Sequence, residues 1–100
     1  MAEKKAEKKT VEINGKKYAD ADFKALVPDV NVLDDMELVD DMSQLQDGNG
    51  LRIAPILRKL LGDQYKTVLN DLRDKETGRV SVLVVAEFLE ALMRAVSPNS

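Results

Sequence analysis

The stretch VLVVAEFLEALMRAV (Val82–Val96) decides how this chain folds. As a helix it carries one broad apolar face, which smaller apolar residues extend round both flanks. Only Glu87, Glu90 and Arg94 mark a side that faces water, and Glu90 is spaced to pair with Arg94 one turn later. A helix this apolar is either central to a core or pressed against another chain, and in a small helical domain both can hold.

The apolar residues of this helix divide by their angle around its axis. Val85, Leu89 and Leu92 lie in the middle of the apolar face and are predicted to be core. Leu83 and Phe88 lie nearer the flanks and are the first candidates for a partner surface. The full set of candidates on this helix is Leu83, Val84, Phe88 and Met93.

Three further helices are predicted before it. Apolar residues recur at helical spacing through 32–46 and again through 64–75. A helix over 52–61 carries Pro55, which is tolerable only in the first turn, and Gly62 stops it.

Capping residues and breakers set the expected boundaries. Asn31 is predicted to cap the helix over 32–46, and DGNG (47–50) ends it. Asp63 is predicted to cap the helix over 64–75. The segment 25–32 is interpreted as a connector, because Pro28 breaks any helix there.

The N-terminal part predicts a β-hairpin over about 10–19. Asn14-Gly15 is the strongest short hairpin signal, since both turn positions must accept positive φ, and Tyr18 pairs across from Val11. A lone hairpin is only marginally stable, so it must lean on helices or on another chain. The Lys/Glu/Ala run 1–9 is expected to be a frayed tail. The fold class is therefore mainly α: a small four-helix domain over 10–97 with a short N-terminal β-hairpin.

Composition narrows the function. The chain has 100 residues, no Cys and no His, which removes disulfides, thiolate and imidazole catalysis and the usual zinc ligands. No catalytic set or cofactor motif appears, so we expect neither an enzyme nor a bound cofactor. The N-terminus has no apolar core typical of a secretion signal, and no apolar stretch approaches the roughly 18 residues of a membrane span. We expect no membrane partner and a cytoplasmic protein.

Charge is unevenly distributed. Residues 25–51 carry seven acids and no base. Asp34, Glu37 and Asp41 lie largely opposite the apolar side of the helix predicted over 32–46. This acidic face is either simply solvated or meets a basic partner, for which the Lys-rich N-terminus of a sister chain would serve.

The run DKETGRVSVLVVAEFLEALM (74–93) has the composition of a calcium loop but not its spacing. With Gly78 at the sixth loop position, Arg73 falls at the first and Val84 at the twelfth, where acids are required. With Glu87 at the twelfth position instead, Val80 falls at the fifth. The sequence therefore predicts no metal site.

The best basic stripe is too weak to predict nucleic-acid binding. It is diluted by Asp63 and Asp71, and no aromatic residues are interleaved with it. Its members are Arg52, Arg58, Lys59 and Lys66.

Four segments, in this order, carry a family resemblance: VEINGKKY (11–18), LDDMELVDDMSQLQDG (33–48), APILRKLLGDQYKTVLNDLRDKETGRVSV (54–82) and EFLEALM (87–93). The order resembles the small tail assembly chaperones of long-tailed bacteriophages, over roughly 10–96. The run 60–80 is the most telling part. The Lys-rich tail lies outside the resemblance.

The resemblance implies a non-enzymatic holdase. Such chaperones coat the long, hydrophobic tape measure protein before tail-tube subunits polymerise round it, and they often exist also in a longer frameshifted form that recruits the tube protein. The implied partners are the tape measure protein and possibly the tail tube protein, with a possible homo-oligomer. The implied location is the cytoplasm of the infected bacterial host, with absence from the mature virion.

Two other interpretations stay open. One is a small acidic regulatory protein, suggested by the base-free block 25–51. The other is an adaptor built from a degenerate calcium-type helix pair. Gene neighbourhood separates them, because a tail assembly chaperone gene lies between a major tail protein gene and a very long tape measure gene.

Overall fold

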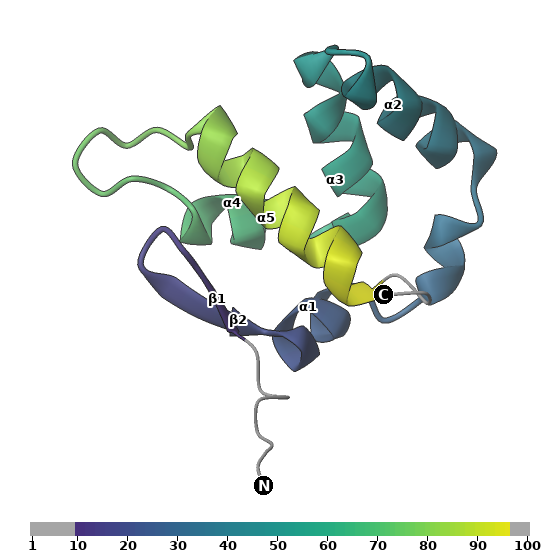
Figure 1. Cartoon of the computed structure of the whole chain (residues 1–100). Coiled ribbons are helices and arrows are strands. Elements are labelled where there is room, and N and C mark those ends of the chain that lie inside the picture. The colour runs from purple at the N-terminus through teal and green to yellow at the C-terminus, as the bar shows by residue number, and fades with distance from the viewer. Residues whose placement is uncertain (1–9, 97–100) are drawn as a thin grey trace, which may run out of the picture.

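The computed structural model describes residues 10–96 (Figure 1). The predicted tail over 1–9 and the predicted end of the domain at residue 97 lie outside the described residues. Three short 3-10 turns, Val30–Leu33, Gly50–Arg52 and Gly62–Gln64, connect some of the main elements. Those elements are β1 (Thr10–Ile13), β2 (Lys16–Ala19), α1 (Asp20–Leu26), α2 (Met36–Gln46), α3 (Ile53–Leu61), α4 (Tyr65–Asp71) and α5 (Val82–Val96).

Helix α5 is the centre of the packing. It contacts α1, α3 and β1, while α2 packs on α3 at the far side from the hairpin. Its mid-face residues Val85, Leu89 and Leu92 are all buried, as predicted, and Glu90 accepts a hydrogen bond from Arg94 at 3.2 Å. The apolar helix is therefore the core of this domain.

The predicted class, a mainly α four-helix domain with an N-terminal hairpin, is confirmed, and the structure adds the short helix α1. The Ala19 N–H donates to Asp22 Oδ2 at 2.8 Å and so caps α1. Only Phe23 is buried in this helix, and the prediction missed it because one anchoring residue in seven creates no detectable period.

The hairpin follows its prediction. Val11 pairs with Tyr18, and the turn residues Asn14 and Gly15 take φ values of 56° and 81°. Both are positive, which matches the mirror-image turn that suits the twist of a hairpin. Ile13 and Tyr18 are buried, so the hairpin leans on the helices of its own chain.

Three aromatic rings join the hairpin, α1 and α5. Tyr18, Phe23 and Phe88 lie with ring centroids 5.3 to 5.5 Å apart. Phe88 is 0% exposed. Its assignment to a partner surface is therefore wrong, because β2 and α1 cover the flank of α5 on which it lies.

The start of α2 differs from the prediction. Asn31 lies inside the 3-10 turn Val30–Leu33, and α2 begins only at Met36. The cap is Asp35, whose Oδ1 accepts the Glu37 N–H at 2.9 Å. Several capping residues follow one another here, and local propensity does not decide which of them starts the helix.

Helices α3 and α4 meet at Gly62. Pro55 lies in the first turn of α3, and Gly62 ends that helix with φ of 54°, as predicted. Asp63 does not cap α4, because the chain continues through the 3-10 turn Gly62–Gln64 directly into it. Helix α4 ends at Asp71 rather than near 75.

The link from α4 to α5 is pinned at its base. Arg73 and Val80 form an isolated antiparallel bridge, and the Arg73 guanidinium donates to the Gly78 carbonyl at 2.8 Å. Asp74 Oδ1 accepts the backbone N–H groups of Glu76 and Thr77. The Asp74 carboxylate therefore shapes a turn in this link.

Candidate protein-binding groove

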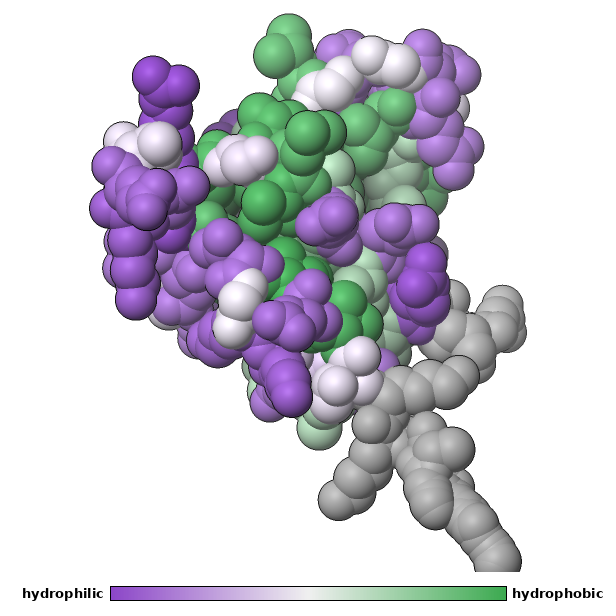
Figure 2. Space-filling view, turned by 60° about the vertical axis from the view of Figure 1, so that its left-hand side comes forward, coloured by the Kyte–Doolittle hydropathy of each residue, from purple (hydrophilic) through white to green (hydrophobic). Residues whose placement is uncertain are grey.

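Three of the most exposed large apolar side chains lie around the N-terminal end of α5. Leu51, Leu83 and Val82 are 86%, 78% and 66% exposed. Figure 2 shows an apolar area on this face, bordered by hydrophilic side chains. Contiguous apolar surface of this kind, rimmed by polar residues, marks interaction sites in soluble proteins.

Beside these residues the surface is hollowed. A cavity of about 300 Å³ opens between the 3-10 turn Gly50–Arg52, α3, α4 and the first turns of α5. Within residues 10–96 no charged side chain lines it. We call it the apolar groove, and its lining residues are Gly50, Leu51, Ile53, Ala54, Leu57, Tyr65, Leu69, Val80, Val82 and Val85.

Local structure explains why the groove stays open. The bridge from Arg73 to Val80 sends the link 74–79 away from the body of the domain (Figure 1). The first turn of α5 therefore has no helix above it, while Val80 is held at the groove edge. Val85, one turn further on, is already buried and forms part of the floor.

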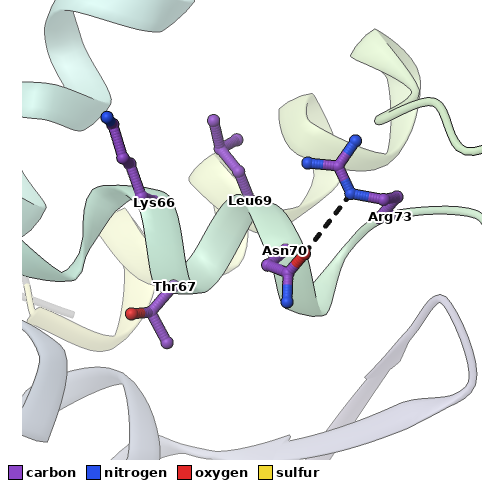
Figure 3. Close-up of a pocket in the computed structure, with 5 residues that line it drawn as sticks. All are labelled: Lys66, Thr67, Leu69, Asn70 and Arg73. Carbon is purple, nitrogen blue, oxygen red and sulfur yellow. Dashed lines mark hydrogen bonds between the residues drawn. The ribbon is translucent and has the colours of Figure 1, made fainter.

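The α4 edge of the groove is basic. Arg58 lies over the Tyr65 ring with its guanidinium carbon 5.7 Å from the ring centroid. Leu69 lines both the apolar groove and a neighbouring hollow that is also lined by Lys66 and Arg73 (Figure 3). Apolar contact and positive charge therefore lie side by side on this surface.

The acidic residues predicted as a partner site turn mainly toward their own chain. Asp41 is only 8% exposed and pairs with Arg52 at 3.4 Å and with Lys59 at 3.9 Å. Its assignment to a partner surface is wrong, because the 3-10 turn Gly50–Arg52 and α3 lie against this side of α2 and supply one base each. Glu37 is exposed yet also accepts from Lys59, at 3.2 Å, and Asp34 is exposed.

The acidic residues around Lys59 change the pKa of its amino group. Desolvation alone would lower the pKa of Lys59, but the hydrogen bond to Glu37 and the charges of the neighbouring carboxylates outweigh it, so the pKa is raised. Lys59 thus remains charged at neutral pH, and together with Arg52 it pairs with the acids of α2. Lys59 and Arg52 are two of the four residues of the basic stripe noted in the sequence.

The α5 candidates also separate in the structure. Leu83 is exposed next to Val82, whereas Val84 and Met93 are half-buried against the core. Leu83 is therefore the one exposed α5 candidate; it does not line the groove but directly follows the lining residue Val82. The prediction missed Leu51 and Val80. The only sequence signal for Leu51 is its place directly after DGNG (47–50). At such a helix boundary the sequence does not show whether a leucine faces the core or the solvent.

A buried hydroxyl lies on the other side of the domain. Tyr18 Oη has no hydrogen-bond partner within the described part of the chain. Burial raises the pKa of Tyr18, and the charges of Asp71 and Asp22 add to this while that of Lys16 opposes it. The nearby Lys16–Asp71 ion pair spans 3.4 Å and joins β2 to α4.

Over residues 10–96 no cluster of three or more potential metal ligands occurs, and no helix is both long and apolar enough to cross a membrane. Comparison with protein-family models, with curated proteins and with solved structures finds no match to this chain. Within residues 10–96 the groove and its rim are the candidate site. Apolar contact flanked by charge is the arrangement that helix-in-groove recognition uses.

Proposed function

We propose that this protein is a phage tail assembly chaperone that binds the tape measure protein and keeps it soluble during tail assembly. The observation that carries the proposal is the apolar groove, with Leu51, Val82 and Leu83 exposed beside it. The order of segments across 10–96, which resembles that family, supplies the identity of the client.

The physical reason is the client's own surface. A long helical protein that will later line a tube exposes apolar stripes, which aggregate unless another apolar surface covers them. Burying one leucine-sized side chain contributes about 1.5–3 kcal/mol. A few such contacts along the groove give binding that holds the client but releases it when tube subunits arrive.

The proposal also fixes where the protein acts. Client and chaperone meet in the cytoplasm of the infected host, and the chaperone leaves before the tail is complete, so it is absent from the mature virion. The tail tube protein is a second possible partner.

Co-expression with the tape measure protein encoded next to this gene tests the proposal. We expect the soluble fraction of the client to rise with the chaperone and to fall again with Leu51→Ser or Leu83→Ser. Met36→Ser is the matched control, because Met36 is 77% exposed on α2, away from the groove. A client whose solubility does not depend on the chaperone contradicts the function, and equal effects of all three substitutions contradict the site.

A second function is an acidic adaptor that binds a basic protein through α2. The exposed acids of the base-free block favour it, among them Asp34, Asp40 and Asp47. In that case Asp40→Lys abolishes complex formation in a pull-down with the partner, while Leu83→Ser leaves it intact.

A further inference from the structure

We propose that the apolar groove selects partner helices that carry acidic residues along one edge of their apolar stripe. This inference rests on the proposed function only in taking the groove as the place where a client helix binds. It goes further by assigning the charge of that helix. The assignment follows from which bases of this chain are already paired and which are not.

The pairing of bases is uneven across the surface. Arg52 and Lys59 are held by acids of α2, and Lys16 is held by Asp71. Within residues 10–96, Lys66 and Arg73 form no ion pair with a carboxylate, and the Arg73 guanidinium donates instead to the neutral oxygens of Gly78 and Asn70. Arg58 likewise forms no ion pair within this range and lies over the Tyr65 ring. The segment 52–80 carries seven bases and four acids, so this surface keeps a surplus of positive charge.

Three of the bases that form no ion pair within residues 10–96, Arg58, Lys66 and Arg73, lie beside the groove lining. Lys66 and Leu69 extend from the same side of α4, and Arg73, just beyond the end of that helix, extends to this side too, while Thr67 extends from the other (Figure 3). Leu69 is part of the groove lining, so Lys66 and Arg73 flank an apolar groove residue. Arg58 reaches the same edge through Tyr65, which also lines the groove.

The rim bases follow the α4 edge of the groove. Lys66 lies on α4, and Arg73 lies two residues beyond the end of that helix at Asp71. A partner helix that lies along this edge meets both bases when acids recur along one side of its apolar stripe. Opposite charges at the rim of an apolar contact add orientation and speed of association more than affinity.

A second copy of this chain offers a weaker version of the same chemistry. Its α2 exposes only Met36 and Val39 as large apolar residues, and its Glu37 is already held by Lys59. Two apolar residues do not fill a groove lined by ten. We therefore assign the groove to a separate partner helix with a longer apolar stripe.

Two designed peptides test this without the tape measure protein. Both form an amphipathic helix with the same leucine stripe, and one carries Glu and the other Lys along one edge. We expect fluorescence anisotropy to show at least tenfold tighter binding of the Glu peptide at about 50 mM salt, with the difference largely lost at about 500 mM, where screening is strong.

Three variants locate the effect. Lys66→Glu is expected to remove most of the preference for the Glu peptide. Lys24→Glu, the same change at an exposed lysine on α1, should leave the preference in place. Leu51→Ser should weaken both peptides by a similar factor, because it alters the apolar lining and not the charge.

Several results overturn the inference. Equal binding of both peptides, or tighter binding of the Lys peptide, excludes acid selection. Failure of both to bind a chain that self-associates, with Met36→Ser abolishing that self-association in sedimentation, assigns the groove to α2 of a second copy instead. If the tape measure protein still requires the groove while both peptides bind equally, the proposed function stands and only the charge selection falls.

Discussion

Two apolar residues of α5 have opposite environments. Phe88 is wholly buried against Tyr18 and Phe23, whereas Leu83 is mostly exposed. Phe88→Ala should lower the free energy of unfolding by about 3–5 kcal/mol, because a large buried ring leaves a cavity. Leu83→Ser should change it by less than about 0.5 kcal/mol. Urea titration followed by circular dichroism measures both. A small effect for Phe88→Ala would mean that the aromatic cluster is not part of the stable core.

The buried Tyr18 hydroxyl gives a second prediction at this scale. Since Tyr18 Oη has no partner in the described structure, Tyr18→Phe should leave stability unchanged or raise it by about 1 kcal/mol. The raised pKa of Tyr18 means that the unfolded chain loses this proton first. The stability that the protonated Tyr18 hydroxyl contributes to the folded state is therefore fully present below pH about 10. It is lost as the pH rises further, through the pKa of Tyr18 in the folded protein.

Urea titrations across pH 8 to 11 check this, taken around the ordinary tyrosine pKa of about 10. The alkaline loss of stability should be smaller in Tyr18→Phe than in the unchanged protein. Tyr65→Phe is the control, because Tyr65 is only half-buried. An identical pH profile for Tyr18→Phe and the unchanged protein would show that the hydroxyl has a partner in solution.

Among the elements, α2 shows where a local signal is ambiguous. Asp35 caps it through the Glu37 N–H, while Asn31 belongs to the preceding 3-10 turn. Asp35→Ala should therefore destabilise the domain by about 1 kcal/mol, and Asn31→Ala by clearly less. Thermal unfolding of the two variants compares them directly. Equal losses would mean that the helix begins earlier, as the sequence alone predicts.

The elements that the sequence predicts well are those with strong local signals. Asn14-Gly15 specifies a hairpin turn, Gly62 stops a helix, and the apolar face of Val82–Val96 specifies a core helix. The element it misses, α1, has a single buried residue, Phe23. Phe88 was misplaced for the same reason, since the helix that covers it was not foreseen.

The groove is a property of the whole molecule. Its lining comes from 50–57, 65–69 and 80–85, and only packing brings these three segments together. The sequence predicts Leu83 on a flank of its helix, and this residue is exposed. No sequence signal indicates that Leu51 and Val80 line the same apolar groove. Likewise the pairing of Asp41 with Arg52 depends on how α2 lies on α3. From the sequence alone, an acid that pairs with a base of its own chain cannot be told from one that pairs with a base of another protein.

The last prediction concerns how the whole domain unfolds. The hairpin shares one core with α1 and α5, because Ile13 and Tyr18 are buried in the same cluster as Phe23 and Phe88. We therefore expect a single cooperative transition, as is usual for domains of this size.

The chain has two tyrosines and no tryptophan, so Tyr65→Phe leaves Tyr18 as the only tyrosine fluorophore. In that variant the urea midpoint from Tyr18 fluorescence should coincide with the midpoint from helical circular dichroism. The reciprocal variant, Tyr18→Phe, should give the same midpoint from Tyr65, which lies at the groove. If Tyr18 fluorescence changes at clearly lower urea than the helical signal, the hairpin opens first, and its packing on α5 is then a separate, weaker unit and not part of one core.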